Sequence, residues 1–313
     1  MTKRRNRFTL IELLVAIGLL SLIMMLLFQL FSSAQKLWIA SEKTNNLYSN
    51  ARVSMELMAD ILNTVQFSHG EKDDGSRNKE KDMIFSLDSK STFTYGGKHY
   101  DSNSVIFVAK TARELPMANN PSRFISFRLG KFGTPAFENG EPSDEDKNTR
   151  GKLLMVVYSD KKGEDESESE FYKFFPVYTS YNGKRDSALT ALKSKMDSLV
   201  TKFKNSTSAS GENEHCQVIA ENVVEFKLTA FSRSIDDGEL KKEADVTDFP
   251  EPPYMIEIQI TVLDPDSFKR WQQLSDNVPQ GETQSPRTRY LEQNKHTFTR
   301  CVYIGNRWAL EAK

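Results

Sequence analysis

The amino-terminal part of the chain is a long apolar segment that directly follows a basic one. From Leu13 to Gln35 no residue carries an ionisable side chain, and Leu13 to Phe31 is almost wholly apolar apart from Ser21 and Gln29. A helix needs roughly 20 such residues to cross the hydrocarbon core of a bilayer. The segment is preceded by the basic residues Lys3, Arg4, Arg5 and Arg7, which favour a cytoplasmic amino terminus. The pattern predicts a single-pass membrane helix, with the bulk of the protein outside the cytoplasm.

Helical periodicity continues beyond the apolar segment. The residues that recur at steps of mainly three and four are Thr44, Leu47, Tyr48, Ala51, Met55, Met58, Ile61, Leu62 and Val65. No Gly or Pro interrupts the stretch between Leu19 and Val65. The sequence therefore predicts one continuous helix from Phe8 to about Gln66, whose second half is amphipathic and packs on a folded head.

The rest of the chain reads as mostly β. Short apolar runs rich in aromatic and β-branched residues predict strands at 83–87, 105–109, 124–129, 153–158, 171–178, 223–231, 255–263 and 297–304. Ile256, Ile258 and Ile260 alternate with polar residues, which is typical of an antiparallel sheet with one wet face. Helices are expected at 187–203 and, shorter, near 267–274. The long polar stretches at 68–82, 139–151, 163–170, 205–214 and 275–293 predict loops.

These elements define an α+β fold class: a long N-terminal helix packed on a mostly antiparallel β head with one or two short extra helices. The expected organisation is a basic leader at 1–7, a transmembrane and assembly helix at 8–31, its amphipathic continuation at 32–66, and an extracytoplasmic β-rich head at 67–313. The formal charge of the 313 residues is -1, but 38 basic and 43 acidic residues remain once the four basic residues of the leader are set aside. The part of the chain after the leader is mildly acidic, whereas a protein that binds nucleic acid has to neutralise phosphate charges with Lys and Arg. No nucleic-acid partner is therefore expected.

Glu12 is an acidic residue at the start of the apolar segment, where a charge is costly unless it has a partner. A cleaved secretory signal peptide is one alternative, because Ser32-Ser33-Ala34 gives a small-x-small pattern before a cut. The apolar stretch, however, exceeds the roughly 7 to 15 residues usual for such a signal.

The run Phe8-Thr9-Leu10-Ile11-Glu12-Leu13-Leu14-Val15-Ala16-Ile17 resembles the cleavage and methylation motif of type IV prepilins and pseudopilins. The resemblance implies that a prepilin peptidase cuts the Arg7-Phe8 bond and N-methylates Phe8. It also implies that Glu12 pairs with the amino terminus of a neighbouring subunit during filament assembly. The family normally has Gly before the cut, where this chain has Arg7, and without cleavage Glu12 would meet no free amine at Phe8.

A weaker resemblance concerns the subtype. Arg52 to Thr64 with Glu56 and Asp60, Val218 to Phe231, and Pro253 to Leu263 followed by Phe298-Thr299-Arg300 resemble elements of the J-type minor pseudopilin of type II secretion. The resemblance implies a minor subunit of a pseudopilus at the bacterial inner membrane, with its head periplasmic or extracellular. The implied partners are other pilin-like subunits, the prepilin peptidase, an inner-membrane assembly platform and the lipid bilayer. A minor pilin of a type IV pilus or DNA-uptake filament, and an uncleaved membrane-anchored binding protein, are the alternatives.

Candidate chemistry is sparse. No GxSxG, HExxH, GxxxxGK[ST] or GxGxxG motif is present, so neither an enzyme nor a cofactor is expected. The acidic loop with Asp144, Asp146 and Asn148 is a weak calcium candidate, because oxygen ligands alternate there; Thr149 and Met155, however, stand where the turn Gly and the bidentate Glu belong. Cys216 and Cys301 could form one disulfide in an oxidising compartment or remain as two thiols.

Overall fold

The structure is a computed structural model, and it describes a large part of the chain. The described residues are 10–67, 70–71, 75, 77–78, 84–88, 90–95, 98–110, 122–130, 137–138, 141–142, 150–159, 171–174, 184–205, 216–233, 239–243, 253–275 and 277–304. The chain divides into two compact units, Met1–Ser49 and Asn50–Lys313. We refer to the second as the folded unit.

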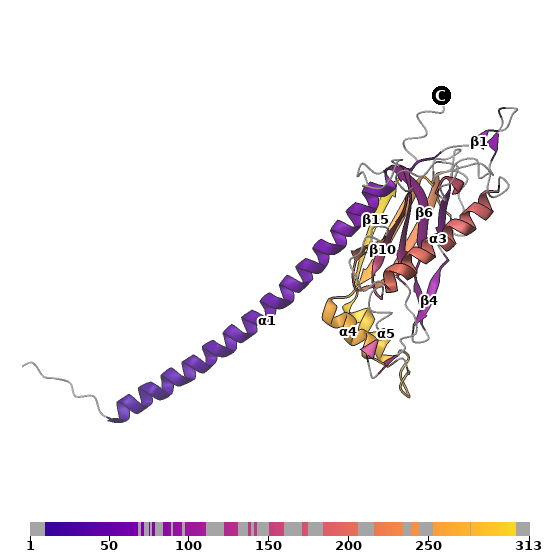
Figure 1. Cartoon of the computed structure of the whole chain (residues 1–313). Coiled ribbons are helices and arrows are strands. Elements are labelled where there is room, and N and C mark those ends of the chain that lie inside the picture. Colours follow the sequence, from indigo (N-terminus) through magenta and orange to yellow (C-terminus); the bar gives the residue numbers. More distant parts are fainter. Residues whose placement is uncertain are drawn as a thin grey trace, which may run out of the picture. The chain divides into compact units, whose positions relative to one another are not determined.

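Helix α1 runs from Leu10 to Leu62 without a break (Figure 1). The sequence prediction of one continuous helix is confirmed, although the helix ends four residues before Gln66. Within the folded unit α1 buries a stripe spaced at three and four residues, made of Ala51, Ser54, Met55, Met58, Ala59 and Leu62. After the helix, the Gln66 N–H donates to the Val108 carbonyl at 2.8 Å, which joins the chain to strand β6 (Ser104–Lys110).

Two antiparallel sheets form the folded unit. The five-stranded sheet has the order β11-β10-β7-β6-β3, with bounds Cys216–Ala220, Leu153–Tyr158, Ser122–Leu129, Ser104–Lys110 and Phe85–Asp88. The four-stranded sheet has the order β13-β12-β14-β15, with bounds Leu240–Glu243, Val223–Arg233, Met255–Val262 and His296–Tyr303. Together with α1 they confirm the α+β class. The chain passes from one sheet to the other at Asn222, a residue with φ 58° and one of the types that tolerate this conformation.

Three short hairpins complete the β structure. They are β1 (Gly70–Glu71) with β2 (Arg77–Asn78), β4 (Thr92–Tyr95) with β5 (Lys98–Asp101), and β8 (Phe137–Glu138) with β9 (Glu141–Pro142). None of them was expected from the sequence, nor were β11 and β13, because these segments are short or carry many polar residues. The stretch 218–231, which was compared with a single strand in the sequence, belongs to two strands, β11 and β12.

Helix α3 (Arg185–Asn205) covers one face of the five-stranded sheet (Figure 1). Its buried residues Ala188, Leu192 and Met196 join Ile106, Val108, Phe124, Leu154, Val156 and Tyr158 of the sheet in one apolar core. The opposite face carries Phe85, Phe107 and Phe127, whose rings lie in contact, with centroids 6.2 and 5.8 Å apart. The sheet is therefore buried on both faces.

Two predictions about the folded unit were wrong. Residues 171–174, expected to begin a strand, form a turn and the 3₁₀ helix η2 (Tyr172–Phe174). Phe171 and Phe174 fit there because both pack edge-on against Phe124 of the core. The expected loop at 275–293 contains most of helix α5 (Pro286–Asn294), which follows α4 (Pro265–Gln273).

Candidate functional site

The first candidate site is the amino-terminal part of α1, because it is apolar and uncovered. All of its residues from Leu10 to Ser49 are exposed except Leu47, and its large apolar side chains up to Ile39 are 50–79% exposed. Among the described residues, α1 is the one helix long and apolar enough to cross a membrane by length and composition. The 19 residues from Leu13 to Phe31 would rise about 28 Å, close to the hydrocarbon thickness of a bilayer.

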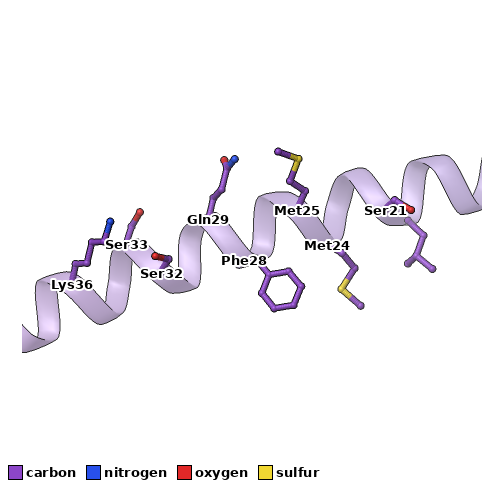
Figure 2. Close-up of a pocket in the computed structure, with 9 residues that line it drawn as sticks. Ser21, Met24, Met25, Phe28, Gln29, Ser32, Ser33 and Lys36 are labelled. Atoms are coloured by element: carbon purple, nitrogen blue, oxygen red, sulfur yellow. The ribbon is translucent and has the colours of Figure 1, made fainter.

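Polar groups occupy defined places on this helix. Glu12 lies in the first turn of α1. The Ser21 hydroxyl donates to the Ile17 carbonyl at 2.8 Å, so its polar group is satisfied within the helix itself. Figure 2 shows Gln29, Ser33 and Lys36 projecting from the same side, at the end of the apolar segment. The helix thus carries a charge near its start, an apolar centre and a polar edge after it.

Several candidate residues from the sequence lie outside the described residues. These are Arg7 and Phe8 of the expected cleavage site, and Asp144, Asp146 and Asn148 of the calcium candidate. Among the residues that the structure describes, no group of three or more His, Cys, Asp or Glu side chains is placed to hold a metal ion.

The two cysteines are free thiols in separate sheets, so the disulfide considered from the sequence is not formed. Cys216 is buried on β11, in the core beneath α3, whereas Cys301 is exposed on β15. A buried thiol that belongs to one core cannot meet a thiol on the outer surface of another sheet without rearrangement of the backbone. Burial raises the pKa of the Cys216 thiol to about 12.

We expect the two thiols to differ strongly in reactivity. At pH 8 a pKa of about 12 leaves roughly one part in 10⁴ of Cys216 as thiolate, the nucleophilic form. Maleimide labelling of the full chain in detergent should therefore modify Cys301 at least 100-fold faster than Cys216, and denaturant should remove the difference. The Cys301→Ser variant serves as the control and should label only after unfolding. Equal rates in the native protein would contradict the buried position of Cys216.

An ion pair links α1 to the four-stranded sheet within the folded unit. Glu56 Oε1 lies 3.4 Å from Arg52 Nε on the same helix and 3.7 Å from Arg300 Nη1 on β15. The sequence did not reveal that Glu56 and Arg300, which are 244 positions apart in the chain, meet. Since these side chains are 39–79% exposed, the contacts contribute little to stability.

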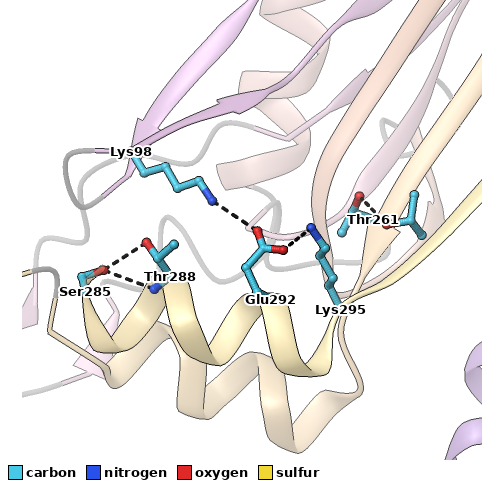
Figure 3. Close-up of polar contacts among 7 residues, drawn as sticks. Lys98, Thr261, Ser285, Thr288, Glu292 and Lys295 are labelled. Atoms are coloured by element: carbon cyan, nitrogen blue, oxygen red, sulfur yellow. Dashed lines mark hydrogen bonds and ion pairs between the residues drawn. The ribbon is translucent and has the colours of Figure 1, made fainter. Parts of the chain in front are cut away.

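A second polar cluster lies between α5 and the strands β5 and β12. Glu292 accepts from Lys295 at 2.5 Å and pairs with Lys98 of β5 at 3.7 Å (Figure 3). The hydrogen bond from Lys295 lowers the pKa of the Glu292 carboxyl. Nearby, burial raises the pKa of Glu225 on β12, and the charge of Asp101 adds to this effect. The ion pairs of Glu292 join α5 to β5, and the charges of Lys98 and Lys295 also act on Glu225 of β12, so we interpret the cluster as structural.

This cluster was not expected from the sequence because helix α5 was not predicted. A signal was present: Ser285 caps the helix, accepting from the Thr288 N–H at 3.2 Å, and Pro286 occupies the first turn (Figure 3). Ser followed by Pro is a typical helix start.

Comparison with known proteins gives no match, whether with family models, with curated proteins or with solved structures.

Proposed function

We propose that the chain is a minor structural subunit of a type II secretion-like pseudopilus, tethered in the membrane and assembled into a filament through α1. The observation that carries the proposal is the apolar, exposed segment of α1 with Glu12 in its first turn. A helix that serves only as an anchor has no need of a carboxylate at that position, whereas in a filament such a charge can pair with a group of a neighbouring subunit.

The continuity of α1 supports assembly over simple anchoring. One helix contributes both the membrane-length segment and a buried stripe of the folded unit, with no Gly or Pro between Leu19 and Leu62. Subunits that pack side by side through such helices would hold their folded units in a fixed relation to the filament. The described part of the folded unit is large: it contains two main sheets and, after α1, three helices of nine residues or more. This size favours a minor subunit over one that is repeated along the whole filament.

The first test is mass spectrometry of the mature amino terminus from the native host. We expect the chain to begin at Phe8 and to carry one N-methyl group, because the motif from Phe8 to Ile17 resembles that of prepilins. A chain that retains Arg7 would favour an uncleaved, membrane-anchored binding protein. A chain cut after Ala34 would favour a secreted one, and either result would overturn the proposal.

The second test is the Glu12→Ala substitution. We expect the variant to insert and to be cleaved, yet to enter filaments at least 10-fold less efficiently, because the amino terminus of its neighbour would lack a counter-charge in an apolar setting. The measurement is the amount of the subunit in sheared filaments or in crosslinked complexes, relative to the amount in membranes. Glu12→Gln, which keeps the shape and removes the charge, should fail similarly.

The matched control is Glu42→Ala, which removes an exposed carboxylate from the same helix beyond the apolar segment. It should assemble normally. Normal incorporation of Glu12→Ala would refute the assembly role of this charge, whereas loss of both variants would indicate a general defect of the helix.

A further inference from the structure

A polar cavity of about 300 Å³ lies between α3 and one end of the five-stranded sheet. Elsewhere under α3 the same two elements enclose an apolar core, and Ile106 belongs both to that core and to the cavity wall. The lining therefore changes from apolar to polar within one continuous interface. The volume of the cavity is at the lower end of the roughly 300–1,000 Å³ that small-molecule sites occupy.

The strand register builds the first wall. Asp88 of β3 lies opposite Ser104 of β6, and Ser104 lies opposite Arg128 of β7. Residues directly opposite in neighbouring strands share one face of the sheet, with Cβ atoms about 4.5–5.5 Å apart. A carboxylate, a hydroxyl and a guanidinium thus form one row across three strands and face the cavity.

Helix α3 builds the opposite wall. Lys193 and Asp197 are four residues apart and so lie on the same helical face. Asp197 Oδ1 lies 2.6 Å from Arg128 Nη1, which closes one side of the cavity with an ion pair between helix and sheet. The Arg128 side chain is only 20% exposed, so its guanidinium is held in place.

Hydroxyl groups line the remaining side. Ser91 and Ser102 flank the β4–β5 hairpin, and Thr92 is its first residue. The Ser102 N–H donates to the Ser91 carbonyl at 3.0 Å, so the two flanks are fixed to each other. With Ser104, four hydroxyls that both donate and accept hydrogen bonds surround the space.

We propose that this cavity binds a saccharide. Two carboxylates and two cations give the lining no net charge, so it offers no excess of either sign to a phosphate or a divalent cation. A sugar hydroxyl both donates and accepts, and it matches a wall in which donors, acceptors and hydroxyls alternate. Ile106 supplies the small apolar contact that the C–H groups of a sugar ring require. The proposal is independent of filament assembly, because the cavity lies wholly within the folded unit.

The test is saturation-transfer NMR on the full chain in a detergent without a sugar head group. The probes are maltose, cellobiose and N,N′-diacetylchitobiose, which differ in linkage and substituents. We expect saturation transfer to at least one of them, with an affinity that falls at least 10-fold in Asp88→Asn and in Lys193→Gln. Both substitutions remove a charge, Asp88→Asn with the shape retained and Lys193→Gln with a shorter side chain. The thermal unfolding of each variant without ligand shows whether the fold is retained.

The matched control is Lys202→Gln, on an exposed position of the same helix, which should bind as the parent does. Absence of transfer from all three disaccharides would overturn the proposal, and so would transfer that neither cavity variant weakens. Stabilisation by inorganic phosphate or calcium chloride that depends on Asp88 and Lys193, without a response to the sugars, would overturn it in favour of an ion site.

Discussion

Replacing Trp271 with alanine is expected to lower the free energy of unfolding of the folded unit by about 3–5 kcal/mol, the usual range for removing a fully buried large aromatic side chain. Trp271 of α4 is 0% exposed. Its ring meets Tyr100 edge-on at 5.8 Å and lies 5.8 Å from Phe268. Because Tyr100 belongs to β5, the substitution would leave a cavity at the point where helix and hairpin meet.

A charged neighbour adds to this expected loss. The Arg287 guanidinium lies 5.9 Å from the centre of the Trp271 ring, and Arg287 is only 8% exposed. Its Nε donates to the Trp271 carbonyl and its Nη2 to the Gln272 carbonyl, both at 3.1 Å. The backbone bonds would survive the substitution, but the guanidinium would lose the aromatic face that compensates for its burial.

The measurement is denaturant unfolding of the full chain in detergent, followed by circular dichroism so that the loss of an indole does not affect the signal. Trp38→Ala is the matched control, because Trp38 is 75% exposed on α1 outside the folded unit. It should leave the unfolding midpoint unchanged. A loss below about 1 kcal/mol for Trp271→Ala would mean that α4 does not pack as described.

The region around Trp271 shows why part of the fold could not be predicted. The sequence predicted α4 to within two residues of its start and one of its end. In the structure Asp264 caps this helix and accepts from the Asp266 and Ser267 N–H groups. The sequence did not predict α5, whose buried residues are Arg287 and Leu291. In the sequence, Arg287 counts as a polar residue although it is buried in the structure. The nine-residue helix therefore shows no apolar periodicity in the sequence.

Of the candidate sites too, the sequence revealed some and not others. Glu12 could be found from the sequence because a charge in an apolar run is conspicuous by itself. The row of Asp88, Ser104 and Arg128 could not be found, since it exists only in the register of three strands. The burial of Cys216 beneath α3 likewise depends on β11, a short strand that the sequence pattern did not reveal. Local patterns thus predict elements, and pairing between distant segments creates the sites.

The second large effect is expected at Gly151, which precedes β10 and has φ +63°. A Cβ atom there would lie 2.2 Å from Cζ of Phe268, a side chain that is 7% exposed and packs on Trp271. The Gly151 carbonyl also accepts from the Val223 N–H at 2.8 Å, so the backbone is held where β12 begins. Neither the ring nor the backbone is placed to move away without disturbing this packing.

We therefore expect Gly151→Ala to lower the free energy of unfolding by about 2–5 kcal/mol, through about 1–2 from the left-handed backbone and the remainder from overpacking. Gly281→Ala separates the two terms, because Gly281 has φ +88° and nothing within 4 Å of its Cβ position. It should cost only the backbone part, as measured by the same denaturant unfolding. Equal losses for the two variants would show that Phe268 yields freely. A smaller loss for Gly151→Ala in a Phe268→Ala background than in the parent would identify the ring as the source of the difference.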